Sequence, residues 1–273
     1  MCYRFFIVIV VLIAACALIN CNKKSVPEPE INTGRLELVF EHYVNGSPLE
    51  KNSLIYVNAA GNPYLVTEVK YFISDITLYP RQGNPVMIHQ SKDIFYIDDD
   101  ILATLDQLIT DPIPVGTYDS LRFIFGISES ENISNRYVNP PEVFMSWPEV
   151  IGGGYHYMML NGKWQDTAGV IRPFNFHLGI GQLYKGNVIN VDSIYAFVQN
   201  YFIVRLPDLR FEMKAGDTMV MNLRMNIESW FATPYVYDHN YWGGNIMQNQ
   251  PAMQMARENG FDVFTAGIVR SHP

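Results

Sequence analysis

Hydrophobic and polar residues alternate with a period of two along most of the chain after residue 34. In residues 35–43, Leu36, Leu38 and Phe40 fall on one face together with His42. This period is typical of a β-strand with one buried face. The same pattern, or a short aromatic run, predicts further strands at 53–58, 66–79, 92–97, 120–127, 155–160, 173–178, 188–198, 201–206 and 218–226.

Turn-forming residues separate these strands. Asn45-Gly46 and the clusters at 60–63 and 114–117 are rich in glycine, asparagine and proline, which favour turn conformations. Residues 128–148 form a longer stretch whose prolines do not fit the interior of a strand or a helix. Many short strands joined by turns and long loops predict an all-β fold, specifically an antiparallel β-sandwich.

Two short helices are predicted within this β-rich chain. Apolar residues at 101, 102, 105, 108 and 109 have helical spacing, and Asp98-Asp99-Asp100 would cap the positive end of that helix. A calcium site is the sharper interpretation of the three aspartates, but no further oxygen ligands follow at the spacing of a calcium loop. The second helix is predicted at 251–259 and ends at Gly260.

The first 20 residues have the layout of a secretory signal peptide. Arg4 precedes an apolar run from residue 5 to residue 19. The run is shorter than the roughly 20 residues that a membrane-spanning helix needs. It ends at a cysteine, which predicts lipidation at Cys21. Cys16 is the alternative: it follows smaller residues, but its use would leave an apolar stub after the anchor.

These boundaries divide the chain into a signal peptide at 1–20, a flexible tether at 21–34 and a single folded domain at 35–273. The tether is rich in charged residues and proline and has no apolar periodicity. We therefore expect an exported protein, held by lipid at the outer membrane on its periplasmic or cell-surface side.

Composition narrows the classes of function. All three cysteines lie within the first 21 residues, which excludes disulfides, catalytic thiolates and thiolate metal sites from the folded domain. The formal charge is −8, and removing residues 1–20, which contain Arg4 and no acid, makes it −9. An acidic chain without a lysine or arginine cluster is a poor nucleic-acid binder. No Gly-x-Ser-x-Gly motif occurs, and we predict no catalytic residues and no enzyme activity.

His156 and His177 are the residues best suited to bind a metal. Each lies in an apolar and aromatic segment of a predicted strand, and residues 161–172 are long enough to join the two strands as a hairpin. In a suitable register the imidazoles become cross-strand neighbours, with Cβ atoms about 5 Å apart. Neutral imidazole is the commonest side-chain ligand of copper and zinc. The alternative is a pair of buried histidines that only hydrogen-bond to backbone carbonyls.

Three other residues are candidate additional ligands. Strand alternation places Met158 on the face of His156, and its thioether would favour copper over magnesium or calcium, although methionine also fills cores. His42 lies on the apolar face of the first strand and His239 in a predicted loop. His42 either approaches the histidine pair or merely packs, and His239 is either an additional ligand or a surface residue.

Several blocks of sequence occur in a specific order between residues 36 and 264. They are 71–78, 116–118, 121–127, Met145-Ser146-Trp147, Gly154-Tyr155, Leu160-Asn161-Gly162 and Phe176-His177-Leu178-Gly179. Together these blocks resemble the MbnP family, periplasmic or surface copper-binding proteins similar to MopE.

The resemblance implies a β-sandwich that binds copper through two histidines without catalytic turnover. It also implies a tryptophan that a diheme peroxidase-like partner enzyme oxidises to kynurenine. Trp147 is the candidate for this oxidation because it lies in one of the family blocks, whereas no Trp-x-His sequence occurs in this chain.

The sequence therefore predicts a lipid-anchored, extracytoplasmic metal-binding protein, with copper as the metal, that serves acquisition, storage or delivery. The alternative is a surface lipoprotein of the same fold that binds a glycan or a protein without metal and uses loop tryptophans as contact residues. A hydrolase ranks last, since only the general abundance of polar loop residues supports it.

Overall fold

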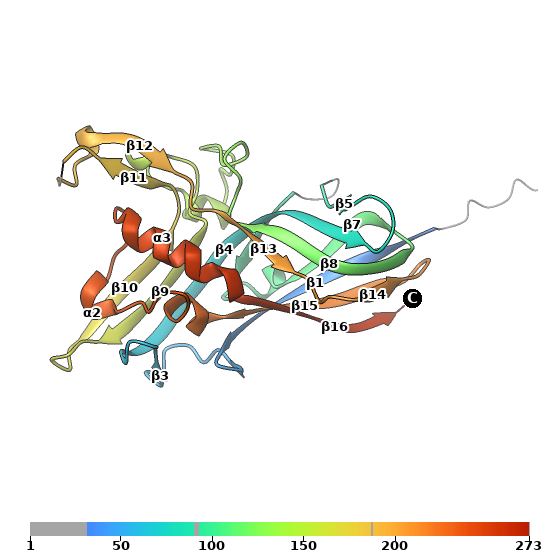
Figure 1. Ribbon diagram of the computed structural model, residues 1–273, viewed down its shortest axis with the longest axis horizontal. Coiled ribbons are helices and arrows are strands. Elements are labelled where there is room, and N and C mark those ends of the chain that lie inside the picture. Colours follow the sequence, from blue (N-terminus) through green and yellow to red (C-terminus); the bar gives the residue numbers. More distant parts are fainter. Residues whose placement is uncertain (1–31, 90–92, 187, 273) are drawn as a thin grey trace, which may run out of the picture. The chain divides into compact units, whose positions relative to one another are not determined.

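Two β-sheets pack face to face in the computed structural model, which describes residues 32–89, 93–186 and 188–272 (Figure 1). The smaller sheet has the order β16-β15-β1-β2, with β7 paired to β1. Its strands are β1 (Thr33–Val44), β2 (Ser47–Pro48), β7 (Asp106–Pro114), β15 (Thr218–Asn226) and β16 (Phe264–His272). The predicted signal peptide and both candidate anchor cysteines lie outside the described residues.

The larger sheet has the order β10-β9-β4-β8-β13, with β3, β5 and β6 also paired to β4 and β14 to β8. Its strands are β3 (Tyr56–Val57), β4 (Pro63–Pro80), β5 (Val86–Met87), β6 (Ile94–Asp98), β8 (Gly116–Phe125), β9 (Met158–Gln165), β10 (Ile171–Leu178), β13 (Phe202–Leu206) and β14 (Phe211–Met213). A separate hairpin consists of β11 (Gly181–Tyr184) and β12 (Ile194–Val198).

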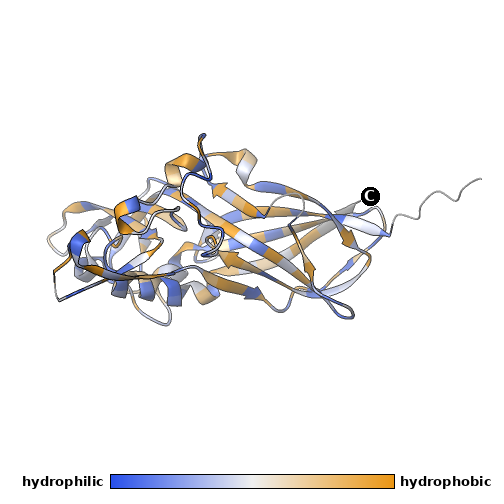
Figure 2. Ribbon diagram, turned by 90° about the horizontal axis from the view of Figure 1, so that it is seen from above, coloured by the Kyte–Doolittle hydropathy of each residue, from blue (hydrophilic) through white to orange (hydrophobic). Residues whose placement is uncertain are grey.

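The predicted all-β antiparallel sandwich is confirmed. Among the strand pairs of the described residues, only β1 and β15 run parallel, with Leu36 opposite Met219. Figure 2 shows hydrophobic and hydrophilic residues alternating along the strands, as expected for sheets with one face against a core. The first strand begins at Thr33, two residues before the predicted start of the domain.

Side-chain alternation gives the larger sheet two different faces. Its inner face meets the smaller sheet, where Tyr71 of β4 contacts Phe40 of β1. Its outer face lies under the loop that precedes β9, where Phe72 stacks on Tyr137 with a centroid distance of 5.8 Å. Neighbouring residues of one strand therefore reach two separate environments.

The predicted C-terminal helix is confirmed as α3 (Gln250–Asn259). The Asn249 side chain accepts a hydrogen bond from the Ala252 amide at its start, and Gly260 follows its last turn. A four-residue helix, α2 (His239–Trp242), occupies a segment predicted as loop. Short 3₁₀ turns occur at Leu102–Thr104, Glu142–Met145, Glu149–Ile151, Val191–Ser193, Ile227–Phe231 and Gly260–Asp262.

The predicted helix at 101–109 is wrong. Only Leu102–Thr104 form a helical turn, and β7 follows at once. Ile109 and Ile113 are buried and Leu108 is half exposed, because β7 pairs with β1 and alternates between core and solvent. Pairing with a neighbouring strand has overridden a local pattern that fits a helix equally well.

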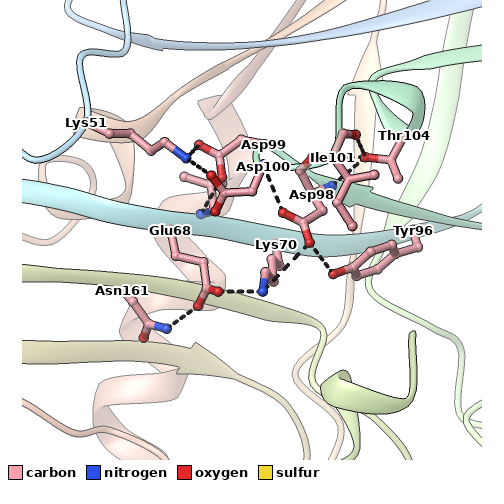
Figure 3. A network of polar contacts seen from close by, with 11 residues as sticks. Lys51, Glu68, Lys70, Tyr96, Asp98, Asp99, Asp100, Ile101, Thr104 and Asn161 are labelled. Carbon is pink, nitrogen blue, oxygen red and sulfur yellow. Dashed lines mark hydrogen bonds and ion pairs between the residues drawn. The ribbon is translucent and has the colours of Figure 1, made fainter. Parts of the chain in front are cut away.

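The three aspartates cap no α-helix and instead join a network of polar contacts (Figure 3). Lys51 Nζ lies 3.0 Å from the Asp99 carboxylate and also pairs with Asp100. Tyr96 donates a hydrogen bond of 2.7 Å to Asp98. Cationic and hydroxyl groups of the protein thus already satisfy this acidic cluster.

In the part of the chain that the structure describes, no helix combines the length and the apolar character needed to cross a membrane.

Candidate metal centre

His156 and His177 meet on the outer face of the larger sheet. His177 is the penultimate residue of β10, and its neighbours Phe176 and Leu178 point inward. β9 and β10 form the predicted hairpin, with His177 opposite Met159. Strict alternation therefore puts His177 on the face of Met159 and away from the sandwich core.

His156 reaches this face because it does not lie in a regular strand. It was predicted within a strand at 155–160, but β9 begins only at Met158. The three glycines before Tyr155 have φ values of 127°, 68° and 76°. Residues other than glycine rarely adopt such positive φ values. A bend at Tyr157, between His156 and the start of β9, breaks the alternation that would have turned His156 toward the core.

The two imidazole rings are in contact and buried. Their centroids lie 5.0 Å apart at an interplanar angle of 85°. Only 6 % of His156 and 7 % of His177 are exposed. Trp147 also contacts His156, with ring centroids 4.6 Å apart. The structure thus brings together both predicted ligands and the predicted tryptophan.

Hydrogen bonds define which nitrogen of each ring is available. Nδ1 of His156 lies 2.9 Å from the carbonyl oxygen of Met145 and so donates a proton to it, which leaves the lone pair on Nε2. Nε2 of His177 lies 2.8 Å from Oδ1 of Asn161 and donates to it, which leaves the lone pair on Nδ1. That Nδ1 is buried and has no partner among the described residues.

Burial keeps both rings neutral. It lowers the pKa of His156 to about 4, although the carbonyls of Met145 and Ser146 oppose the shift. It lowers the pKa of His177 to about 3, and the neighbouring His156 adds to this effect. At neutral pH the site therefore holds two uncharged imidazoles, the form that binds a metal ion.

These residues fit a metal ion with a preference for nitrogen ligands. A buried, unpaired imidazole nitrogen beside a second neutral imidazole is a costly arrangement unless something accepts its lone pair. Metal–nitrogen bonds of about 2 Å to both rings are compatible with imidazoles in contact. In the described ranges, no aspartate, glutamate, cysteine or further histidine completes a three-membered ligand group with this pair.

Trp147 is held close by its own contacts. It is 2 % exposed, and its Nε1 donates to the carbonyl of Ile151 over 3.2 Å. Gly179, two residues after His177, makes room for it: a Cβ atom there would lie 2.6 Å from the indole ring. An intact indole offers no lone pair, so Trp147 supplies a ring surface rather than a ligand atom.

The other candidate ligands lie elsewhere. Met158 is buried in the core, opposite Leu178 in the hairpin and therefore on the inner face. His42 also contacts the inner face, where its ring meets Tyr71 edge to face at 5.7 Å. His239 stacks on Phe174 at 4.6 Å, again among inward-facing residues. None of the three reaches the histidine pair.

Asn161 and Glu68 are polar residues of the site that sequence reasoning missed. Asn161 contacts His177, and its amide nitrogen donates to the Glu68 carboxylate over 2.5 Å. A signal was present in the sequence, because both residues occupy outward-facing positions in strands rich in buried residues. Their proximity depends on how β4 pairs with β9, which one sequence does not reveal.

Comparison with known proteins identifies the family. A model of the MbnP family matches residues 33–249. The solved structure of MbnP from Methylosinus trichosporium is similar in fold, with a TM-score of 0.54 and 13 % sequence identity. The match covers 86 % of this chain and 99 % of that one. No curated protein matches the sequence. The family match spans most of the described sandwich and both histidines, and the chain belongs to the MbnP family.

Proposed function

We propose that this chain is a lipid-anchored, extracytoplasmic protein that binds copper between His156 and His177 for acquisition, storage or delivery. The observation that carries the proposal is the pair of buried, neutral imidazoles in contact. One of them presents a nitrogen without any partner in the described structure. Two nitrogen ligands, a neighbouring aromatic ring and no carboxylate suit copper better than calcium or magnesium.

Copper is favoured over zinc by the small number of ligands. Structural zinc sites use four protein ligands, and catalytic zinc sites use three. The described part of the chain offers two imidazoles and no cysteine, aspartate or glutamate as a third ligand. When bound, copper would supply a redox-active cation. The protein's own residues would hold it in a buried position, and we propose no catalytic turnover at this site.

Trp147 is proposed as the third residue of the centre. Its ring contact with His156 supports this role. Its intact N–H is a donor and already bonds to Ile151. Oxidation of the ring to kynurenine would create an aromatic amine able to bind the metal: a diheme peroxidase-like partner would use peroxide as the oxidant to open the five-membered ring, and the C2 carbon would leave as formate. Intact mass measurement of protein from its native envelope tests this modification.

The anchor is proposed at Cys21, with Cys16 as the alternative. Both residues precede a charged and proline-rich segment, which suits a short solvated link between lipid and domain. Mass spectrometry of the lipidated N-terminal peptide distinguishes the two sites. Changing Cys21 to serine would release the protein from membranes if Cys21 carries the lipid.

A copper titration of the purified domain tests the binding proposal. We expect one equivalent of copper to bind to the wild type and none above background to the double variant His156→Ala, His177→Ala. The variant His89→Ala is the control, because His89 is an exposed histidine outside the site. The proposal fails if the wild type takes up neither Cu(I) nor Cu(II), or if the double variant binds as well as the wild type.

The alternative of glycan binding by loop tryptophans receives little support from the geometry. Trp147, Trp164 and Trp230 are each at most 5 % exposed and offer no ring face to a sugar in solvent. Trp242 is only partly exposed. Copper binding is therefore the function that the described residues support best.

A further inference from the structure

A ladder of polar side chains crosses the outer face of the larger sheet and ends at His177. It runs from Asp98 on β6 through Lys70 and Glu68 on β4 to Asn161 on β9 (Figure 3). Asn161 then contacts His177 on β10. Strand register builds the ladder, because Lys70 lies opposite Asp98 and Glu68 opposite Asn161.

The charges of Lys70 and Glu68 determine how the Asn161 amide is oriented. Lys70 Nζ lies 2.5 Å from one oxygen of Glu68 and 3.7 Å from Asp98, so the ammonium group holds the Glu68 carboxylate in place. The other oxygen of Glu68 accepts the amide N–H of Asn161. A carboxylate only accepts hydrogen bonds, so the amide nitrogen of Asn161 must face Glu68 and its oxygen must face His177.

The orientation of Asn161 in turn determines the proton on His177. An amide oxygen accepts and does not donate, so the ring nitrogen that faces it must carry the hydrogen. That nitrogen is Nε2, at 2.8 Å. The neutral ring then has its lone pair on Nδ1, the buried nitrogen without a described partner.

We propose that Asn161, oriented by Glu68 and Lys70, is a positioning residue that holds His177 in the Nε2–H tautomer and makes Nδ1 the ligating atom. The role of Nδ1 as a ligand rests on the proposed copper function. The tautomer of His177 follows from the hydrogen bonds alone. Partners that orient a ligating histidine commonly change metal affinity by 10- to 100-fold when they are removed. Asn161 touches the ligand and not the metal, so it acts through His177.

Nitrogen NMR of the metal-free protein tests the tautomer directly. With ¹⁵N-labelled histidine at pH 7, we expect His177 to show a protonated Nε2 and an unprotonated Nδ1. In Asn161→Leu the acceptor is gone, and we expect a mixture of the two tautomers. A wild-type His177 protonated on Nδ1, or an unchanged tautomer in Asn161→Leu, would overturn the inference.

A matched control separates positioning from general damage to the strand. Asn175→Leu makes the same chemical change directly opposite Asn161, on the same face, at an exposed residue that does not contact His177. We expect Asn175→Leu to keep both the tautomer and the copper affinity. Asn161→Leu should lose about 10- to 100-fold in affinity while retaining the dispersed spectrum of a folded protein.

Rescue provides the second discriminating measurement. In the double variant Asn161→Asp, Glu68→Gln, the carboxylate at position 161 still accepts a hydrogen bond from His177. The amide at position 68 can donate to that carboxylate. We expect this double variant to show the Nε2–H tautomer and near wild-type affinity, and its failure to do so would count against positioning. If instead the tautomer behaves as expected but the wild type binds no copper, the proposed function is wrong and the positioning of His177 stands.

Discussion

Two histidine sites in this protein are both buried but differ in the groups that surround the imidazole ring. His177 and His239 are both nearly or fully inaccessible, and burial lowers the pKa of each to about 3. His177 has a second imidazole beside it and an amide that fixes its proton. His239 has aromatic rings around it, including Phe174, Phe231 and Tyr237, and no described partner at either nitrogen.

The comparison shows that a lowered pKa alone does not identify a metal ligand. Desolvation produces that shift wherever a histidine is enclosed by apolar groups. A ligand additionally needs a defined tautomer and a second donor within reach of the same ion. His177 has an amide oxygen at one ring nitrogen and a second imidazole in contact with it, whereas His239 has neither and packs among aromatic residues of the inner face.

Matched substitutions give the largest expected difference between the two sites. His177→Phe should lower copper affinity by at least about 100-fold, because even the loss of a partner of a ligand costs up to that much. His239→Phe should leave affinity unchanged and raise the free energy of unfolding by about 1 kcal/mol, since it removes two unpaired buried nitrogens. Competition titrations and urea unfolding measure the two effects. Equal copper affinities in the two variants would contradict the distinction.

A smaller effect is expected from Gly179, which makes room for the indole ring that contacts His156. In Gly179→Ala the new Cβ would meet the Trp147 ring at 2.6 Å and push it from His156. We expect the free energy of unfolding to fall by about 1–3 kcal/mol. Gly267→Ala is the control, because a Cβ there meets nothing within 4 Å. Similar unfolding midpoints for the two variants would show that Trp147 is not held as described.

A further expected effect is a pH dependence of stability shared by both sites. In the unfolded chain these histidines bind protons below about pH 6.5. In the folded chain the pKa values are about 4 for His156 and about 3 for His177 and His239. The unfolded state therefore takes up protons first, and the free energy of unfolding falls as the pH drops from about 6.5 toward 4.

Substitutions at His239 and His177 separate the contributions of the two sites to the pH dependence of the free energy of unfolding. His239→Phe should make the pH dependence of urea unfolding shallower, and His177→Phe should do so by a similar amount. Copper uptake by the wild type should persist near pH 5, where an ordinary histidine would be protonated. Loss of copper with a midpoint near pH 6.5 would contradict neutral, buried ligands.

The part of this picture that sequence can predict is the part that depends on local alternation. Thr218–Asn226 is a strand within the predicted limits, and the hairpin that carries His177 follows from its apolar period. The same logic turned His156 and Met158 to one face, because it assumed a regular strand. A bend at Tyr157, between these two residues, overrode it, and alternation does not report such a bend.

Pairings between distant strands were not predictable from one sequence. The polar ladder forms only if Glu68 lies opposite Asn161. The segment predicted as a helix at 101–109 is mostly a strand because it pairs with β1. Trp147 lies beside His156 because Gly179 has no side chain to block the indole ring, and not because the two residues are neighbours in the sequence. Such contacts depend on long-range register, which the local pattern does not specify.

The ladder has a consequence for when the protein becomes able to hold metal. Its members come from β6, β4, β9 and β10, and its last contact sets the donor atom of His177. No short segment of the chain carries the complete arrangement. A nascent or unfolded polypeptide therefore lacks the arrangement that the proposed copper site needs, and the proposed metal capture would begin only after the sheet has closed. The protein would thus load where it folds and would not carry metal with it as an unfolded precursor.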